Sequence, residues 1–478
     1  MESSTKGHDK ALRPRWLGKK VAVVGLGISN VPLIQHLIKA GAEVTVSDRQ
    51  KPGALQERLA EIADLPVSLN LGEGYLDGLD GYDTVFLSPG VPKDLPQIQT
   101  LLKRGVSLSS EIQVFFELCK APIMGVTGSS GKTTTTSLIG EIMKQIDKFH
   151  TFVGGNIGTS LLPQLDSITQ KDLAVLELSS FQLELLPYSP HCAVITNISP
   201  NHLDIHKTME NYIDAKRHIY LFQDPEDFAV LNYDEPQTKA LADECPGQVY
   251  FFSRVQELAQ GVFVKDGLIT VKNMCFAEGG EKAICPIEAV RLLGDHNLEN
   301  VLAATAAAAL CGATPEAIRQ AITTFTGVPH RLEFVEEIGG VRYYNDSIAT
   351  SPARAIAGIK AFQEPLVLIA GGYDKQLSFD LLAKVIMENS VRAVVLTGDT
   401  KEQIEKALKD KQEHRGELKI YKTDDFDGAV LKAGQVSEPG DVVLMSPACA
   451  SYDMFSNFQE RGVRFRQIVK KIKQSKFK

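Results

Sequence analysis

Residues 125–134 read GVTGSSGKTT, a glycine-rich segment that ends in a lysine and two threonines. An apolar stretch precedes it at 122–126 and a helix-forming stretch follows it to about residue 146, which predicts a strand, a loop and a helix. Backbone N–H groups of such a loop, together with the helix N-terminus, bind phosphate oxygens. Lys132 would neutralise the β- and γ-phosphates of a nucleotide, and the Thr133 hydroxyl would reach Mg²⁺. The segment departs from the strict GxxxxGK[ST] pattern, since Val126 occupies the first glycine position.

Three further residues could serve the same chemistry. Glu177 lies near the end of a predicted buried strand at 173–178, where open α/β sheets bind their ligands, and a carboxylate there suits Mg²⁺; a helix N-cap or an edge carboxylate is the alternative. His202 follows a second such strand at 193–197, although a single histidine in that place is more often structural. Lys216 lies in the helical segment YIDAK, where a lysine is normally on the surface.

These residues need a framework of strands and helices. A strand at 20–27 that enters a glycine turn, a helix at 31–40 and a strand at 43–47 predict a βαβ unit, and another strand follows at 83–87. Buried strands are also expected at 341–345, 366–370, 393–397 and 441–446. Strands that alternate with helices in three blocks predict an α/β chain with mainly parallel sheets. Residues 227–285 predict antiparallel strands added to the middle block, and the alanine-rich stretch 298–311 predicts a helix.

Charge and composition narrow the class of protein. The 478 residues suggest two to four domains. The net charge of −8 is unfavourable for general binding to nucleic acid. Seven scattered cysteines without a Cys-x-x-Cys pair indicate free thiols in a reducing compartment. Residues 1–15 are polar and lack the apolar core of a signal peptide, and no apolar run reaches the roughly 20 residues of a membrane span, so we expect a cytoplasmic protein without a membrane segment.

The motifs TGSSGKTT (127–134), ELSSFQLE (177–184), NISPNHLDIH (197–206) and YIDAK (212–216), in this order, resemble the Mur ligase family. The wider superfamily includes folylpolyglutamate synthases. The segments GDHNLEN (294–300) and GVPHRLE (327–333) are further general marks of the family. More specific are SPACASYDMFSNFQERG (446–462), GGNIG (154–158) and SPGV (88–91). These resemble the member that adds D-glutamate to UDP-N-acetylmuramoyl-L-alanine in peptidoglycan precursor synthesis, and the resemblance covers the chain from about residue 18 onward.

The resemblance implies three domains. Residues 1–110 would form a Rossmann-like domain that binds the UDP part of the substrate. Residues 111–327 would form a P-loop ATPase-like domain with a parallel sheet plus a small antiparallel sheet. Residues 328–478 would form a Rossmann-like domain that binds the amino acid. Closure about hinges near Ser110 and Gly327 would exclude water, and the protein would be a monomer.

The resemblance also implies roles for individual residues. ATP would be bound by Gly128, Ser129, Ser130, Gly131, Lys132, Thr133, Thr134, Asn297, Asn300 and Arg331. The UDP substrate would be bound by Ile28, Ser29, Asp48, Ser88, Gly90, Asn156 and Ser179, with His202 also facing its muramoyl-alanine part. D-glutamate would be bound by Thr350, Lys375, Ser451 and Phe458. Two Mg²⁺ ions would be held by Thr133, Glu177, His202 and Lys216, with Lys216 carbamylated, and Lys132, His202 and Lys216 would be catalytic.

The implied reaction transfers the γ-phosphoryl group of ATP to the alanyl carboxylate, and the amine of D-glutamate then attacks the acyl phosphate. One departure concerns residues 346–351, which read DSIATS where the family often has DSKATN, so Ile348 replaces a lysine. The glycine turn at residues 25–30 also departs from the GxGxxG pattern of dinucleotide-binding sites, because Asn30 occupies the third glycine position. This difference argues against a dinucleotide as the ligand. Three alternatives remain: a ligase for a different amino acid, an ATPase without ligase activity, and a nicotinamide-dependent oxidoreductase.

Overall fold

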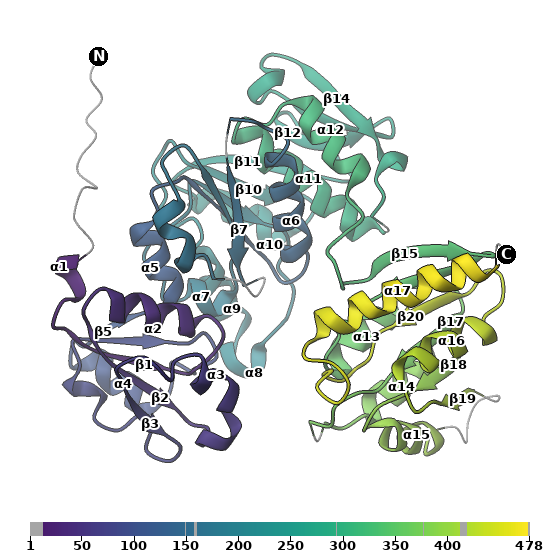
Figure 1. Ribbon diagram of the computed structural model, residues 1–478. Helices are drawn as coiled ribbons and strands as arrows, with labels where there is room; N and C mark the ends of the chain where they lie inside the picture. The colour runs from purple at the N-terminus through teal and green to yellow at the C-terminus, as the bar shows by residue number, and fades with distance from the viewer. Residues whose placement is uncertain are drawn as a thin grey trace. The chain divides into compact units, whose positions relative to one another are not determined.

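The computed structural model describes residues 13–148, 150–156, 160–292, 294–375, 377–411 and 418–476 (Figure 1). The chain forms two compact units, Met1–Phe325 and Thr326–Lys478. Its strands assemble into three sheets, two in the first unit and one in the second. No helix among the described residues is both long and apolar enough to cross a membrane. The seven cysteines, all within these ranges, are free thiols.

The first sheet is parallel throughout, with the order β3-β2-β1-β4-β5. Its strands are β1 (Lys20–Val24), β2 (Glu43–Asp48), β3 (Val67–Leu71), β4 (Thr84–Leu87) and β5 (Ser107–Ser109), and its helices are α1 (Arg13–Trp16), α2 (Asn30–Lys39), α3 (Gln56–Ala60) and α4 (Pro96–Lys103). The residues of β1 after Lys20 are buried, as expected for a parallel strand covered on both faces. The predicted βαβ unit is therefore confirmed.

The second sheet has nine strands in the order β14-β13-β12-β11-β10-β9-β6-β8-β7. They are β6 (Ile123–Thr127), β7 (Thr151–Gly155), β8 (Leu173–Glu177), β9 (Cys192–Ile195), β10 (Phe228–Asn232), β11 (Gln248–Ser253), β12 (Gly261–Lys265), β13 (Leu268–Lys272) and β14 (Glu281–Pro286). The helices of this domain are α5 (Glu111–Leu118), α6 (Lys132–Met143), α7 (Ser180–Leu183), α8 (Leu203–His206), α9 (Met209–Arg217), α10 (Pro236–Ala240), α11 (Asp295–Leu310) and α12 (Pro315–Thr324).

The antiparallel strands continue this same sheet. Only β12, β13 and β14 pair in antiparallel fashion, whereas β10 and β11 are parallel to their neighbours, so the expectation of antiparallel strands over all of 227–285 is wrong for the first two. The reversal occurs at Asp266 and Gly267, both with positive φ. A two-residue Asp-Gly loop of this kind fits the twist of an antiparallel hairpin.

The alanine-rich helix α11 packs against α6. Residues 300–309 of α11 are all buried, and its apolar side chains share one core with Leu138, Ile139, Ile142 and Met143 of α6. Alanine allows two helices to approach closely without loss of helix propensity. This packing places α11 beside the loop that precedes α6.

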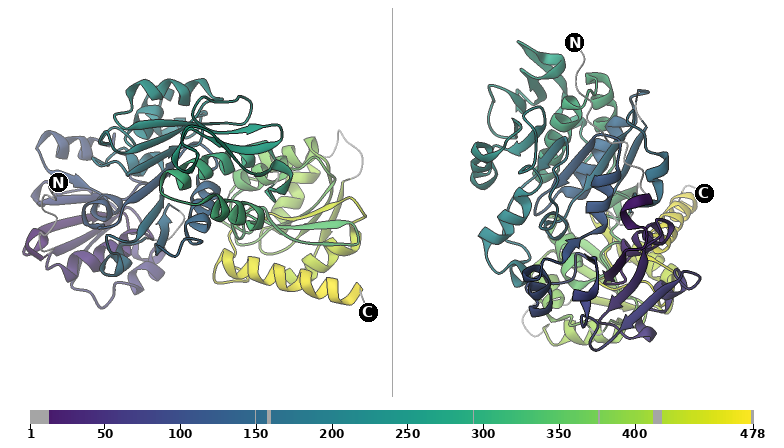
Figure 2. Two further views of the ribbon diagram at one scale, coloured as in Figure 1. Left: turned by 90° about the horizontal axis from the view of Figure 1, so that it is seen from above. Right: turned by 90° about the vertical axis from the view of Figure 1, so that its left-hand side faces the viewer.

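The third sheet has the order β15-β16-β20-β17-β18-β19, with only β15 and β16 antiparallel. Its strands are β15 (Glu333–Ile338), β16 (Val341–Asn345), β17 (Leu366–Ala370), β18 (Val391–Leu396), β19 (Lys419–Lys422) and β20 (Val442–Met445), and its helices are α13 (Pro352–Lys360), α14 (Asp380–Glu388), α15 (Lys401–Lys409), α16 (Phe426–Val436) and α17 (Phe458–Lys476). The long helix α17, yellow in Figure 2, lies against β15, β16 and α16.

Candidate active site

The loop between β6 and α6 has a backbone that requires glycine at two positions. Gly128 and Gly131 have φ angles of 151° and 80°. A Cβ atom at Gly128 would lie 2.0 Å from Oγ1 of Thr196, and one at Gly131 would lie 2.0 Å from Oδ1 of Asn300. Any other residue type would have to push the Thr196 or Asn300 side chain aside, and it would also adopt a φ angle that disfavours a side chain. Gly128 and Gly131 are therefore the two loop positions at which the conformation favours glycine. Val126, which replaces the first glycine of the GxxxxGK[ST] pattern, lies within strand β6 and not in the loop.

Lys132, the first residue of α6, folds back over this loop. Its Nζ donates hydrogen bonds to the carbonyl oxygens of Gly128, at 2.9 Å, and Ser129, at 3.3 Å. The loop is held from the other side by the residues after β9, since the backbone N–H of Ser130 donates to Oδ1 of Asn197 at 2.9 Å. A cation and a helix N-terminus thus meet at one place, which favours an anion.

Glu177 ends β8 and is buried, with 3% of its surface exposed. Its Oε1 accepts a hydrogen bond of 2.8 Å from Nδ2 of Asn156, which follows the neighbouring strand β7. Its Oε2 is buried without any partner in the structure. Leaving a buried carboxylate oxygen unsatisfied is costly, so this atom has the chemistry of a cation ligand.

Lys216 is not a surface residue. Only 1% of it is exposed, and Nζ donates to the Gly128 carbonyl at 2.9 Å and to Oγ1 of Thr127 at 3.3 Å, while it lies 4.6 Å from the centre of the Tyr212 ring. Burial, and then repulsion by Lys132, hold the pKa of Lys216 well below its ordinary value. The structure therefore favours the neutral amine, which is nucleophilic.

His202 lies at the N-terminus of α8 with a φ of 54°, a conformation that costs energy for a residue other than glycine. Its ring packs edge-on against Phe181 of α7, with 5.2 Å between ring centres. The opposite end of α8 contacts the same ring, because His206 stacks on Phe181 at 4.9 Å. Phe181 therefore fixes both histidines. Ser179, just before α7, uses its hydroxyl in a capping box with Gln182.

The candidate residues of the first sheet gather at its carboxyl edge. Ile28 and Ser29 follow β1, Asp48 ends β2, and Ser88 and Gly90 follow β4. Both carboxylate oxygens of Asp48 are used within the protein. They accept backbone hydrogen bonds from Leu26 at 2.7 Å and Gln50 at 2.8 Å. Asp48 thus shapes the glycine turn after β1.

Two asparagines of α11 lie next to the loop. Oδ1 of Asn300 accepts a hydrogen bond of 3.4 Å from the Thr135 hydroxyl, and its Nδ2 donates to Oδ1 of Asn297 at 3.1 Å. Thr135 is in the first turns of α6, just after Thr133 and Thr134. Arg331, the remaining candidate for ATP, belongs to the second unit, where its backbone N–H donates to the carbonyl of Val328 at 3.1 Å.

The residues expected to bind D-glutamate lie at one edge of the third sheet. Thr350 follows β16, Lys375 follows β17 and Ser451 follows β20, whereas Phe458 begins α17. Nζ of Lys375 lies 5.6 Å from the centre of the Tyr452 ring, which is itself half exposed. The sheet thus brings three polar side chains from different loops to the place where parallel α/β sheets bind ligands.

Arg461 is a residue of this region that the sequence does not reveal. It is 2% exposed and donates to the Ser347 hydroxyl and to the carbonyls of Ser347, Cys449 and Ala450, at 3.0 to 3.2 Å. Burial lowers its pKa to about 10. An arginine within a helix is usually exposed, and the NFQERG motif around Arg461 does not indicate that it is buried. It ties together the loops that carry Thr350 and Ser451.

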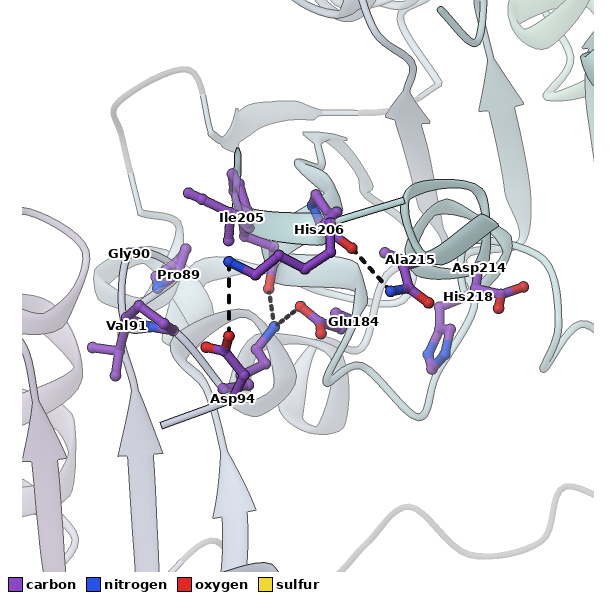
Figure 3. Close-up of a pocket in the computed structure, with 15 residues that line it drawn as sticks. Pro89, Gly90, Val91, Asp94, Glu184, Ile205, His206, Asp214, Ala215 and His218 are labelled. Atoms are coloured by element: carbon purple, nitrogen blue, oxygen red, sulfur yellow. Dashed lines mark hydrogen bonds and ion pairs between the residues drawn. The ribbon is translucent and has the colours of Figure 1, made fainter. Parts of the chain in front are cut away.

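The described part of the chain, these site residues included, contains no group of three histidine, cysteine, aspartate or glutamate side chains arranged to hold a metal ion. Between the first two domains lies a cavity of 360 Å³, lined by Gly90 and Lys93 on one side and by α7, α8 and α9 on the other (Figure 3). It contacts Asn211, Asp214 and His218 of the α9 region, which lie on the opposite face of the helix from Lys216.

Comparison with known families and proteins decides the family. Three family models match: Mur ligase MurD-like, N-terminal domain, at residues 19–110; Mur ligase middle domain, at 126–308; and Mur ligase, glutamate ligase domain, at 330–449. A UDP-N-acetylmuramoylalanine--D-glutamate ligase of Acetivibrio thermocellus is 46% identical over 458 residues, which cover 95% of this chain and 97% of that one.

The chain belongs to the Mur ligase family. A second relative of this Mur ligase, a UDP-N-acetylmuramoylalanine--D-glutamate ligase of Symbiobacterium thermophilum, is 46% identical over 460 residues, or 95% of this chain and 99% of that one.

Solved structures agree in fold. MurF from Acinetobacter baumannii superposes with a TM-score of 0.54 at 17% identity, covering 96% of this chain and 92% of that one. The UDP-N-acetylmuramate-alanine ligase MurC from Thermotoga maritima gives 0.53 at 20% identity, covering 95% and 100%. The expected three-domain α/β architecture is confirmed.

Proposed function

We propose that this Mur ligase adds D-glutamate to UDP-N-acetylmuramoyl-L-alanine with the hydrolysis of ATP to ADP and phosphate, in cytoplasmic peptidoglycan precursor synthesis. The observation that carries the proposal is the 46% identity, over nearly the full length of both chains, to relatives named UDP-N-acetylmuramoylalanine--D-glutamate ligase. The name that these relatives share favours D-glutamate as the amino acid.

ATP binds in this proposal at the loop between β6 and α6. The backbone of residues 128–131, Lys132, Thr133 and Thr134 hold the phosphates, because the loop already combines a cation with a helix N-terminus. Asn297 and Asn300 of α11 contribute from the side, and Arg331 from the second unit. Lys132 would exchange its hydrogen bonds to the loop carbonyls for contacts with phosphate oxygens, which are stronger acceptors.

Mg²⁺ fits the residues that surround Glu177. The unsatisfied Oε2 of Glu177 is a hard oxygen ligand, and Thr133 supplies a hydroxyl. A second ion would be held by His202 and a modified Lys216. When bound, Mg²⁺ neutralises charge on the β- and γ-phosphate oxygens.

The environment of Lys216 supports carbamylation. Its neutral Nζ can attack CO₂, so that an N–C bond forms and a proton leaves to solvent, giving a carbamate anion. The reaction converts a buried amine, which hydrogen-bonds to the Gly128 carbonyl and the Thr127 hydroxyl, into an oxygen ligand. The lowered pKa favours the reactive form of the amine.

The reaction proceeds in two steps. A carboxylate oxygen of the alanyl group attacks the γ-phosphorus and ADP leaves, giving an acyl phosphate. The amine nitrogen of D-glutamate then attacks the acyl carbon, phosphate leaves, and the nitrogen loses a proton. Lys132 stabilises the charge on the transferred group, while His202, held by Phe181, orients the substrate beside it.

Substrate sites follow the three sheets. Ile28, Ser29, Asp48, Ser88 and Gly90 bind the UDP part, and Asn156, Ser179 and His202 face the muramoyl-alanine part. Thr350, Lys375, Ser451 and Phe458 bind D-glutamate. A cation lies close to Ile348 even though the family's lysine is missing there, because Nη1 of Arg354 donates to the Ile348 carbonyl at 3.1 Å. Arg354 and Lys375 therefore provide positive charge for the carboxylates.

Domain boundaries at residues 110 and 327 complete the proposal, with residues 1–110, 111–327 and 328–478 as the domains of a monomer. The proposal places one hinge near Ser110, whose hydroxyl caps α5 by accepting from the backbone of Gln113, and the other near Gly327, which has a positive φ. Closure would exclude water from the acyl phosphate.

ADP release tests the proposed function. ATP, Mg²⁺ and UDP-N-acetylmuramoyl-L-alanine are combined with D-glutamate, L-glutamate, L-alanine or a diamino acid in turn. The proposal is supported if ADP is released only when the added amino acid is D-glutamate, and if an equal amount of amide product forms. Release with another amino acid would refute the specificity, and release indifferent to all four would indicate an ATPase.

A further inference from the structure

Lys93 links the first domain to the second at the loop that follows β4. The side chain is 12% exposed, and Nζ donates to Oε2 of Glu184, at 2.5 Å, and to the carbonyl oxygen of Phe181, at 3.0 Å (Figure 3). Both acceptors belong to the α7 segment of the second domain. The same loop carries Ser88 and Gly90, five and three residues earlier, where the substrate is expected.

The contact reaches the candidate active site through Phe181. The carbonyl of this residue accepts from Lys93, and its ring contacts both His202 and His206. His206 is in turn fixed by a hydrogen bond of 3.0 Å between its Nε2 and the Ser180 hydroxyl. A displacement of Lys93 would therefore shift His202 through one intervening residue, Phe181.

The corner between α8 and α9 joins His206 to α9, the helix that carries Lys216. Nδ2 of Asn211 donates to the His206 carbonyl at 2.9 Å, and the Thr208 hydroxyl caps α9 by accepting from the backbone of Asn211. The corner is thus rigid on both sides. At its centre, Lys207 has a φ of 68° and places its ammonium 3.9 Å from Asp94, beside Lys93.

The two ion pairs differ in solvent exposure. Asp94 and Lys207 are both more than 60% exposed in their side chains, so their pair contributes little. Lys93 is largely desolvated, and burial lowers its pKa more than Glu184 raises it. A pair whose desolvation outweighs its attraction adds little stability, but it fixes one arrangement of the groups that it joins.

We infer that Lys93 is a positioning residue that holds the substrate loop of the first domain in register with α7 and His202 of the second. This inference rests on the proposed function, in which one substrate spans the two domains. A substrate held at both ends binds well only when its two sites keep a fixed separation. The inference predicts that loss of Lys93 weakens binding of the UDP substrate and leaves that of ATP unchanged.

The test compares Lys93→Met with Lys39→Met in the full-length protein. Lys39 pairs with Asp166 across the same two domains at 2.8 Å, but both side chains are over 75% exposed. We expect the KM for UDP-N-acetylmuramoyl-L-alanine to rise about tenfold in Lys93→Met, with the KM for ATP within twofold of the wild type, and no change in Lys39→Met. Equal KM values in the wild type and Lys93→Met, or the same rise in both variants, would overturn the inference.

Two further variants guard against misfolding. Lys93→Arg keeps a cation with several donors, so its KM for the UDP substrate should stay near that of the wild type. Glu184→Gln removes only the negative charge of the pair and should raise this KM, as Lys93→Met does. Hydrogen exchange without any ligand provides a measurement that does not depend on catalysis. Faster exchange in residues 180–183 and 203–206 of Lys93→Met, with no change in Lys39→Met, is expected even if the wild type does not use D-glutamate. Unchanged exchange in Lys93→Met would refute the link itself.

Discussion

Arg461 donates one hydrogen bond to the hydroxyl of Ser347 and another to its carbonyl oxygen, both at 3.0 Å. The same guanidinium reaches the carbonyls of Cys449 and Ala450. These four acceptors are neutral oxygens, so the loops that Arg461 connects solvate a buried cation. This arrangement uses the planar, forked geometry of arginine, which lysine lacks.

Arg461→Lys should therefore destabilise the second unit by about 2–4 kcal/mol, because carbonyl oxygens that are buried lose their donors. The KM for D-glutamate should rise, since the loops that carry Thr350 and Ser451 lose their connection. Urea unfolding and initial-rate kinetics measure the two effects. Arg464→Lys is the matched control, because Arg464 lies one turn further along α17 in an ion pair with the half-exposed Asp427. Similar losses in both variants would contradict the role of Arg461.

Glu177→Gln should abolish most of the Mg²⁺-dependent turnover, because it removes the charge from the oxygen that has no partner in the protein. We expect kcat to fall by at least about 100-fold, and half-maximal activity to require more Mg²⁺. The readout is ADP release as a function of Mg²⁺ concentration. Glu141→Gln, at an exposed ion pair on α6, should behave as the wild type. An unchanged Mg²⁺ dependence in Glu177→Gln would remove Glu177 from the metal site.

Lys216→Met should eliminate a carbamate carbon signal. Protein equilibrated with ¹³C-labelled bicarbonate is expected to show one slowly exchanging carbamate resonance in carbon NMR, because burial lowers the pKa of the Lys216 amine and so favours its reactive neutral form. Lys144→Met removes an exposed lysine and should keep the signal. A resonance that persists in Lys216→Met would assign the carbamate to another amine.

Glu111 should make the protein less stable as pH rises. It is buried at the start of α5 with a hydrogen bond of 2.5 Å from the Ser160 hydroxyl, and burial raises its pKa from 4.5 to about 7. Between these values the unfolded chain releases a proton that the folded protein retains, so the free energy of unfolding decreases from pH 4.5 to pH 7 and then levels off. The total decrease is about 3 kcal/mol.

Glu111→Gln should remove that decrease. The variant and the wild type should unfold at similar urea concentrations at pH 4.5, and the variant should be more stable at pH 8. Glu43→Gln, at an exposed position, serves as the control. Parallel pH profiles for the wild type and Glu111→Gln would show that Glu111 does not govern this range.

The sequence predicts most strands and the phosphate loop because these depend on neighbours along the chain. The stretch 366–370 forms a strand with those bounds, and residues 122–146 give β6, the loop and α6 nearly as expected. Polarity in the loop and apolar runs in the strands are both local signals. The expected gathering of residues at sheet edges also follows, since parallel strands end at one side.

Features that arise from tertiary packing were not predictable in this way. The burial of Lys216 depends on where α9 packs, and a lysine carries no mark of burial in its own sequence. The directions of β10 and β11 depend on which strands they join, so short alternating segments could not fix them. The hydrogen bonds between Arg461 and Ser347, and the ion pair between Lys93 and Glu184, each join residues about a hundred positions apart in the sequence. Local sequence patterns carry no information at that separation.

The fit of Asn300 against Gly131 bears on the order of events during synthesis. The phosphate loop and α6 emerge from the ribosome well before α11, because strands β7 to β14 lie between α6 and α11 in the sequence. Until α11 emerges, α6 lacks one of its main packing partners, and the loop lacks the Asn300 side chain that lies against Gly131. Domains fold as units while the chain emerges. A nascent chain should therefore gain its affinity for ATP late, and a truncation before residue 310 should yield a fragment that needs a chaperone and does not retain nucleotide.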